Sequence, residues 1–221
     1  KGTAPQMTVD GAGTLSTENN ILDGKLSLSA NDLSYYKDLL SLDIAGSVKA
    51  EVILGAEKSK QLADIQTSIS QFKLDKLTLK KADAELHFND VHYPWPQTGN
   101  IQISHLEVSD GISVEKASVT IKDIGNEFYA LAFMGNAYVP SAISFKGSAD
   151  LSNMTNEFPT VNKIDLKTLI GKSTIVMTGA VDPTAVDLKI STKNFRGSDI
   201  PATVSDSLSN IRLNGDVTMI G

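Results

Sequence analysis

Strict alternation of apolar and polar residues between Leu42 and Leu54 is the feature that most constrains the fold. Every even position of this stretch is apolar or glycine, and the odd positions include Asp43, Lys49 and Glu51. Because successive side chains of a β-strand point to opposite faces, a period of two predicts one apolar and one polar face. At about 3.3 Å per residue the strand should be roughly 40 Å long, about twice the usual length.

The same pattern recurs in three later stretches, residues 143–151, 175–181 and 211–219. These stretches share a five-residue pattern in which a glycine at the third position lies between apolar residues at the first and fifth. All three positions fall on the apolar face. Related glycines recur at intervals of about 34 residues or a multiple of that spacing, which is typical of a repeating unit of two or three strands.

The composition limits the class of protein. The 221 residues are enough for one large domain or an elongated repeat array. A net charge of -6 without a basic tract argues against nucleic acid as a partner. The chain has no cysteine, which excludes disulfide frameworks, thiolate catalysis and cysteine-ligated metal sites. No apolar run approaches the roughly 18 residues of a membrane span, and we expect residues 1–221 to be one elongated β-repeat segment of a longer protein.

The rest of the chain predicts further strands and one short helix. Asn31 to Leu40 is predicted to be helical, with Asn31 or Asp32 as its cap. Strands are expected at 7–15, 25–30, 42–54, within 65–88 with changes of phase, and at 106–108, 112–121, 128–134, 143–151, 164–166, 173–181, 186–190 and 211–219.

Three turn predictions follow from sequence chemistry. Residues 93–96, Tyr-Pro-Trp-Pro, are predicted to be a rigid loop, because proline lacks the donor that a central strand requires. Residues 109–111 are predicted to form a three-residue hairpin loop, since this length keeps Val108 and Ile112 on one face. The Asn-Gly pair within 211–219 is predicted to lie in an unbroken strand, because a turn there would split the apolar positions between faces.

No residue pattern specifies an enzyme. His87, Asp90 and His92 could in principle ligate a metal ion, but no third histidine is placed nearby, and surface or loop roles are favoured. Residues 171–173, Gly-Lys-Ser, lack the upstream glycine and the following helix of a phosphate-binding loop. We therefore predict that the chain is not an enzyme and has no catalytic, metal-binding or cofactor-binding residues.

Two interpretations of the apolar faces remain open. In the first they form the core of an ordinary β-sandwich or barrel. In the second one continuous antiparallel or mixed sheet curls around its own apolar face and leaves an elongated groove. Long strands, few aromatic residues and small residues on the apolar face favour the groove, because small side chains leave space and glycine lets a sheet bend. Acyl chains suit such a groove, since each buried methylene contributes roughly 0.8 kcal/mol.

Three segments carry a resemblance to a known family. Residues 30–52 join a short helix to the alternating strand, and residues 169–188 and 213–217 repeat its glycine-containing pattern. Together they resemble TamB-like proteins, which belong to the AsmA-like group of bridge-like envelope proteins. The resemblance covers most of the chain and is weakest over 57–140. It implies a β-taco, which is a long sheet folded into a trough with an apolar interior, and it carries no catalytic motif.

The resemblance also implies a function, partners and a location. The parent protein would be anchored in the inner membrane outside this segment, would lie in the periplasm of a diderm bacterium, and would act with a BamA-like outer-membrane barrel of the TamA type. It would carry phospholipid between the two membranes or aid outer-membrane protein assembly. The alternatives are a structural β-solenoid or sandwich module and a chaperone that holds unfolded outer-membrane strands by edge pairing. The residues expected to line the lipid groove are Leu42, Ile44, Val48, Val52, Leu54, Ile143, Phe145, Ile175, Met177, Leu188, Ile190, Leu213, Val217 and Met219.

Overall fold

The protein is all-β, with 81% of its residues in strands and a helical segment of eight residues. The computed structural model describes residues 2–17, 20–92, 95–108, 112–125, 128–139, 141–154, 159–196 and 212–220. Within these residues the strands follow one another in chain order, the pairings are antiparallel, and the sheet is not closed. The predicted all-β fold, built on a sheet expected to be antiparallel or mixed, is therefore confirmed, and the pairings are antiparallel.

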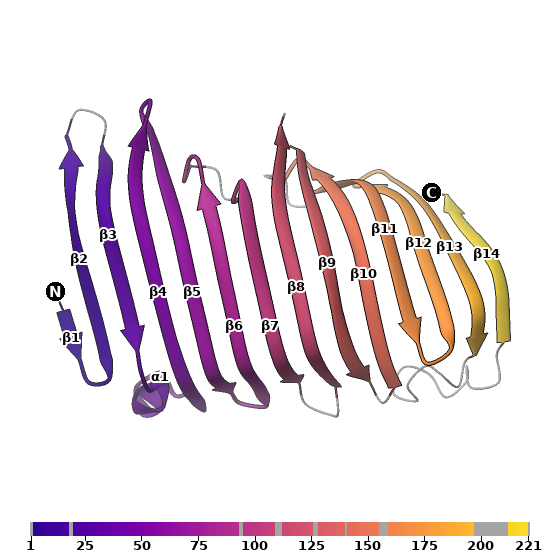
Figure 1. Ribbon diagram of the computed structural model, residues 1–221, viewed down its shortest axis with the longest axis horizontal. Helices are drawn as coiled ribbons and strands as arrows, with labels where there is room; N and C mark the ends of the chain where they lie inside the picture. Colours follow the sequence, from indigo (N-terminus) through magenta and orange to yellow (C-terminus); the bar gives the residue numbers. More distant parts are fainter. Residues whose placement is uncertain are drawn as a thin grey trace. The chain divides into compact units, whose positions relative to one another are not determined.

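The chain divides into two compact units, Lys1–Ser109 and Asp110–Gly221, and each is described by itself. In the first unit β1 to β7 form an antiparallel meander, and a short helical segment lies at the ends of the strands after β3 (Figure 1). The elements are β1 (Gly2–Ala4), β2 (Met7–Ser16), β3 (Ile21–Ala30), the 3₁₀ helix η1 (Leu33–Tyr36), α1 (Lys37–Leu40), β4 (Ile44–Glu57), β5 (Lys60–Leu74), β6 (Leu77–Phe88) and β7 (Thr98–Val108).

The residue before the helical segment suits a helix start, and the residue after it suits a helix end. Asp32 has an extended backbone, and its side chain accepts a hydrogen bond from the Ser34 amide at 2.9 Å. Ser41 ends the segment in the left-handed conformation, with φ 54°. The predicted helix is thus confirmed, and Asp32 rather than Asn31 is its cap.

Strand register gathers the apolar residues of the first unit on one face. Ala30 pairs with Val48, Val48 pairs with Ile69, and Ile69 pairs with Ala82, which in turn pairs with Ile103. Directly paired residues share a face, so this rung carries apolar side chains across five neighbouring strands.

Bulges interrupt the alternation near one end of these strands. The register of β4 shifts between Ala45 and Ser47, where the facing residue Gln71 of β5 has a φ of 49°. His105 of β7 also has a positive φ, 51°. Because a bulge inserts one residue into a strand, the residues that share one face have odd numbers on one side of the bulge and even numbers on the other. The register shift between β4 and β5 accounts for the change of phase between Ile69 and Phe72 within the predicted stretch 65–88.

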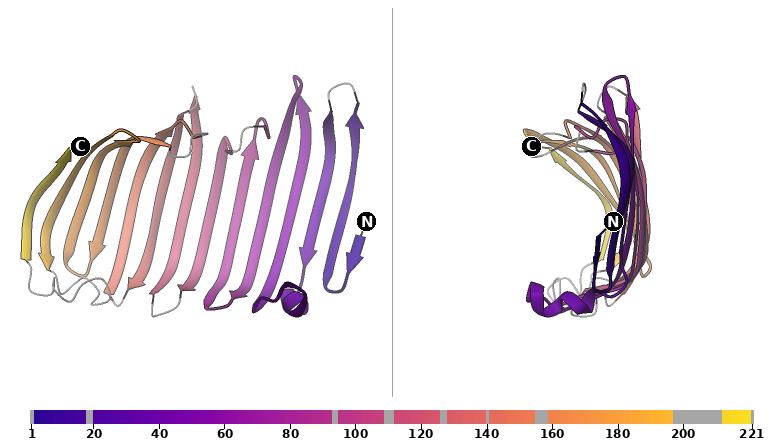
Figure 2. Two further views of the ribbon diagram at one scale, coloured as in Figure 1. Left: turned by 180° about the vertical axis from the view of Figure 1, so that it is seen from behind. Right: turned by 90° about the vertical axis from the view of Figure 1, so that its left-hand side faces the viewer.

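In the second unit β8 to β14 form another antiparallel meander, and its last strands curve strongly along their length (Figure 2). The strand predicted at 211–219 is confirmed as unbroken, because β14 passes straight through its Asn-Gly pair. The elements are β8 (Ile112–Gly125), β9 (Phe128–Val139), β10 (Ser141–Ser152), β11 (Thr160–Ile170), β12 (Ser173–Asp182), β13 (Ala185–Arg196) and β14 (Arg212–Ile220).

In the described part of the second unit, a single rung crosses seven strands, β8 to β14. Each member pairs directly with the next, so the seven residues share one face. From β8 to β14 they are Val119, Phe133, Gly147, Leu166, Met177, Ile190 and Val217.

Two predicted loops fall partly or wholly outside the described residues. Trp95 and Pro96 lie in the connection between β6 and β7, as predicted, whereas residues 93 and 94 are outside the described part of the chain. The predicted hairpin loop at 109–111 is also outside it, although β7 ends at Val108 and β8 begins at Ile112, the bounds that such a loop requires.

Candidate functional site: an apolar face in each unit

Four of the predicted groove residues lie together on β4. Ile44, Val48, Val52 and Leu54 occupy its apolar face, and each is half-buried. Leu42 lies in the turn before β4, outside the strand, and is 41% exposed. The structure therefore brings four of these five residues into one surface and places Leu42 beyond its end.

The register adds residues that were not predicted to line a groove. Val52 pairs with Ile65, and Ile65 with Leu86, so the apolar face continues across β5 and β6. Alternation signals each of these strands, but only register puts their apolar residues on the same face as β4. The added residues are Met7, Val9, Leu28, Ile65, Ile69, Leu86, Ile101 and Ile103.

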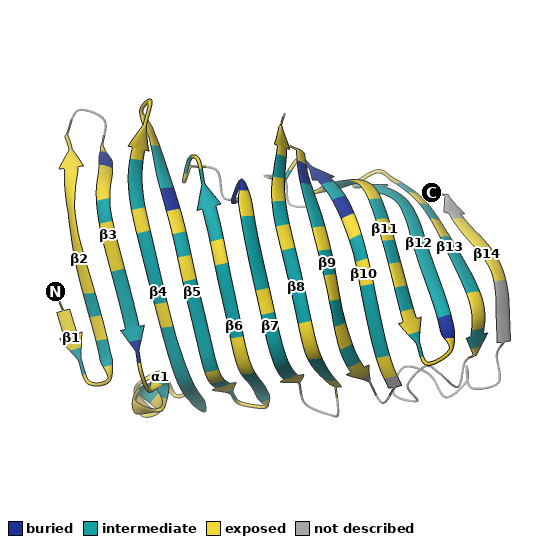
Figure 3. Cartoon of the chain, viewed as in Figure 1, coloured by how far each residue is buried: buried dark blue, intermediate teal, exposed yellow. Residues whose placement is uncertain are grey.

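On β2 and β3, the residues of this face that lie nearest the helical segment are the least exposed. On β3, Ala30 is 2% exposed, whereas Leu26 and Leu22 are 44% and 39% exposed. On β2, Met7 is half-buried, whereas Leu15 is 59% exposed, and β2 is exposed over most of its length (Figure 3). Because η1 contacts β4 and follows directly after β3, the helical segment covers one end of the apolar face.

Nine predicted groove residues fall in the second unit, and the register puts them on one face. Met177, Ile190 and Val217 belong to the rung that crosses β8 to β14. Leu188 pairs with Met219 two residues farther along β13 and β14, in the next rung of the same face. Val217 is 59% exposed. The nine are Ile143, Phe145, Ile175, Met177, Leu188, Ile190, Leu213, Val217 and Met219.

Phenylalanine rings fill space that glycines were expected to leave open. A Cβ added to Gly147 would lie 2.8 Å from the ring of Phe133, and one added to Gly135 would lie 2.5 Å from the ring of Phe145. Gly147 pairs with Phe133 and Gly135 with Phe145, so each ring lies over the glycine of the neighbouring strand. Gly147 and Gly135 therefore leave no open space on this face.

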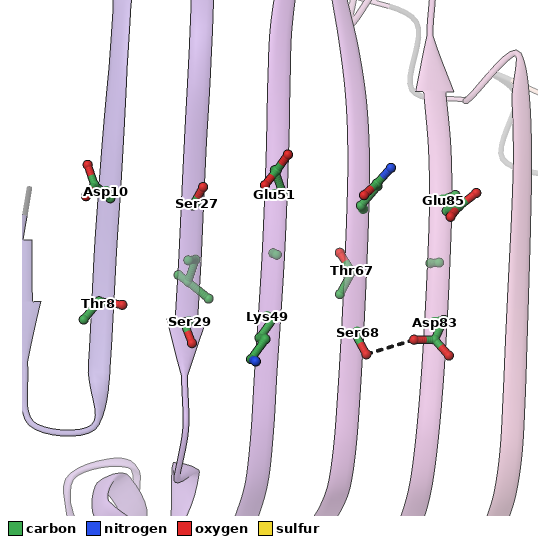
Figure 4. Close-up of a pocket in the computed structure, with 14 residues that line it drawn as sticks. Thr8, Asp10, Ser27, Ser29, Lys49, Glu51, Thr67, Ser68, Asp83 and Glu85 are labelled. Carbon is green, nitrogen blue, oxygen red and sulfur yellow. Dashed lines mark hydrogen bonds between the residues drawn. The ribbon is translucent and has the colours of Figure 1, made fainter.

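The opposite, polar face of the first unit carries a hollow of about 510 Å³ (Figure 4). One row of its lining crosses five strands through Asp10, Ser27, Glu51, Gln66 and Glu85. This hollow does not suit an acyl chain, because 11 of its 14 lining residues are polar or charged and would lose hydration to the chain. It is distinct from the apolar face, which we predicted to bind lipid.

Asp43 joins the helical segment to the ends of the strands. Its carboxylate accepts hydrogen bonds from Lys37 and from Lys73, each at 2.7 Å. These bonds, Lys37 first, lower the pKa of Asp43 to about 2, and the same contact raises the pKa of Lys37. Tyr36 Oη donates a further hydrogen bond to the Pro5 carbonyl in the turn between β1 and β2.

The histidines considered as metal ligands lie in separate polar contacts. Nδ1 of His87 lies 2.5 Å from Asp64 Oδ1, and Nε2 lies 2.8 Å from Asn89 Oδ1. The bond to Asp64 raises the pKa of His87, although desolvation opposes the shift. His92 contacts Asp90 at 2.8 Å. Among the residues that the structure describes, no group of three or more His, Cys, Asp or Glu residues is placed to hold a metal ion.

In the described part of the chain, no helix has the length and apolar character needed to cross a bilayer. No family model, curated protein or solved structure matches the sequence or the fold.

Proposed function

We propose that the chain is a non-enzymatic lipid-conduit segment of a TamB-like protein of the AsmA-like group. One observation carries the proposal. In each unit the apolar side chains of consecutive strands stand in register on one face, and most of them are half-buried instead of sealed in a core. Soluble proteins rarely keep a large apolar surface without a ligand.

The dimensions of the face support an acyl chain as that ligand. Neighbouring strands lie about 4.8 Å apart, so six steps along the rung of the second unit span roughly 29 Å. One acyl chain occupies about half of the roughly 30 Å hydrocarbon core of a bilayer. A chain lying across the strands would meet a similar apolar contact at each step, and about ten methylenes at roughly 0.8 kcal/mol each would supply several kcal/mol. Such binding is non-directional and permits sliding.

On this proposal the ligand is phospholipid, and the protein acts between the inner and outer membranes of a diderm envelope. An inner-membrane anchor lies outside the segment, and a BamA-like outer-membrane barrel of the TamA type is the partner at the far side. A role in outer-membrane protein assembly belongs to the same proposal, since both follow from the resemblance to TamB-like proteins.

Native mass spectrometry of the purified chain tests for bound lipid directly. Charging the apolar face in Val48→Asp or Met177→Asp should abolish the bound lipid, because a carboxylate on that face must be desolvated. Ile53→Asp on β4 and Val176→Asp on β12 are matched controls, because they put the same charge on the opposite face of the same strands. These controls should keep their lipid.

Two results would contradict the proposal. One is wild-type chain that carries no lipid and takes none up from phospholipid vesicles. The other is full retention of lipid by a folded Val48→Asp or Met177→Asp chain, with folding checked by circular dichroism.

A further inference from the structure

We propose that residues 31–42 form a movable cover over one end of the apolar face of the first unit, held closed by a clasp centred on the Asp43 carboxylate. The inference rests on the proposed function, because the cover would control the access of lipid to that face. It concerns the first unit alone.

The exposure of the apolar face shows what the cover hides. Ala30, next to the segment, is 2% exposed, whereas Leu26 on the same face of β3 is 44% exposed. The segment itself has an inner and an outer side. Leu33 and Tyr36 are half-buried, whereas Leu39 is 81% exposed. The inner side therefore protects the Ala30 end of the face, and opening would uncover it.

The clasp joins the cover to two strands through one side chain. Lys37 lies in the cover and donates to Asp43 Oδ1, while Lys73 near the end of β5 donates to Asp43 Oδ2, each at 2.7 Å. The Asp43 carbonyl is fixed to the sheet, because it accepts a hydrogen bond from the Asp75 amide at 2.9 Å. The carboxylate is thus a fixed post to which Lys37 ties the cover.

The cover is built to open at low cost. Opening exposes Ala30 and the half-buried Leu33 and Tyr36. Neither η1 nor α1 contains a fully buried residue, so little core packing is lost when the segment moves. The side chains of Lys37 and Asp43 are 53% and 41% exposed, and an exposed ion pair of this kind is weak and is screened by salt. Backbone changes at Asp32 and at the left-handed Ser41 could absorb the movement, as hinges at element ends do.

Amide hydrogen exchange followed by mass spectrometry tests the clasp without any lipid. Asp43→Asn should speed exchange in peptides covering 33–42 by roughly two- to five-fold, the effect expected from loss of an exposed ion pair. Asp83→Asn is the matched control, because Asp83 also binds a lysine and a second partner but lies on β6. It should leave exchange in 33–42 unchanged.

Salt provides an independent readout on the wild-type chain. Raising the salt from 0.05 M to 1 M should accelerate exchange in 33–42 in the wild type and should add little in Asp43→Asn, whose clasp is already lost. Equal exchange in the wild type and Asp43→Asn, or the same salt response in both, would overturn the proposal.

Uptake of cis-parinaric acid, a fluorescent fatty acid, connects the cover to lipid. The association rate should rise in Asp43→Asn and stay at the wild-type value in Asp83→Asn. Faster exchange in 33–42 with an unchanged association rate would overturn control of access by the cover. If the wild-type chain binds no fatty acid, the proposed function fails and with it the access role, whereas the exchange data still decide whether Asp43 is a clasp.

Discussion

Gly179 on β12 offers the sharpest test of the strand geometry behind the apolar face. Its φ is +143°, a backbone conformation that side chains rarely adopt, and it pairs with Leu188 of β13. A Cβ at this position would lie 2.0 Å from the carbonyl oxygen of Asp187 and 3.0 Å from Leu188 Cα. Both are backbone atoms, so neither can be relieved by a rotamer change. Gly179→Ala must therefore distort the pairing of β12 with β13.

The expected cost of Gly179→Ala follows from three contributions. Holding a non-glycine residue in an unfavourable backbone region costs about 1–3 kcal/mol. Moving the strands apart weakens backbone hydrogen bonds worth about 1 kcal/mol each. Reduced freedom of the unfolded chain offsets about 0.4–1 kcal/mol. We expect a net loss of about 2–4 kcal/mol in the free energy of unfolding.

Urea unfolding followed by circular dichroism measures this loss. With an m-value of about 2 kcal/mol/M, the midpoint should fall by about 1–2 M, and hydrogen exchange should accelerate in peptides from β12 and β13. Gly55→Ala on β4 is the control, because a Cβ there meets nothing closer than Leu62 at 3.9 Å. It should be neutral or stabilising by up to about 1 kcal/mol. An unfolding midpoint for Gly179→Ala equal to that of the wild type would refute the reasoning.

Three further predictions concern side chains of the first unit. Gln61→Ala should accelerate hydrogen exchange of the Leu22 amide by roughly 5- to 30-fold, equivalent to about 1–2 kcal/mol. The reason is that the Gln61 side-chain amide accepts from the Leu22 N–H and donates to the Leu22 carbonyl, each at 2.8 Å. Gln61→Glu should keep the bond from the Leu22 N–H and lose the bond to the Leu22 carbonyl. The charge of Asp43 should stabilise the fold above pH 3.8, and this contribution should be lost as the pH falls through about 2, so Asp43→Asn should flatten this part of an acid-unfolding curve. Protonated His87 should stabilise the fold fully below pH 6.5, and this contribution should disappear as the pH rises through the raised folded pKa. Asp64→Asn should lower the pKa of His87 in an NMR titration, and an unchanged value would contradict the pairing.

Period-two alternation was enough to predict the strands and their apolar faces. The 42–54 pattern becomes β4, which the structure begins at Ile44 and extends to Glu57. Parity also predicted that 211–219 is one strand despite its Asn-Gly pair, and β14 confirms it. Both predictions succeed because side chains alternate between the two faces with every residue of a strand. A turn can therefore be placed only where it keeps the apolar residues of both strands on one face.

Bulges and close approaches between strands could not be predicted in the same way. Gln71 takes a left-handed conformation that its residue type does not signal, because the facing strand decides where the extra residue of the bulge goes. The covering of Gly147 by Phe133 also depends on register, which joins residues 14 positions apart. The sequence showed a glycine on the apolar face, but only the pairing shows which side chain lies above it.

On the proposed lipid function, the phenylalanine rings would narrow the part of the second unit where an acyl chain can lie deepest. Phe133 and Phe145 raise the apolar surface over β9 and β10, whereas the same face on β12 to β14 carries Met177, Ile190 and Val217. The ring faces are themselves apolar, so they extend the surface without blocking it. A charge at Met177 should therefore reduce lipid binding more than Phe145→Leu, which keeps an apolar side chain over Gly135. The reverse order would place the lipid over the rings instead.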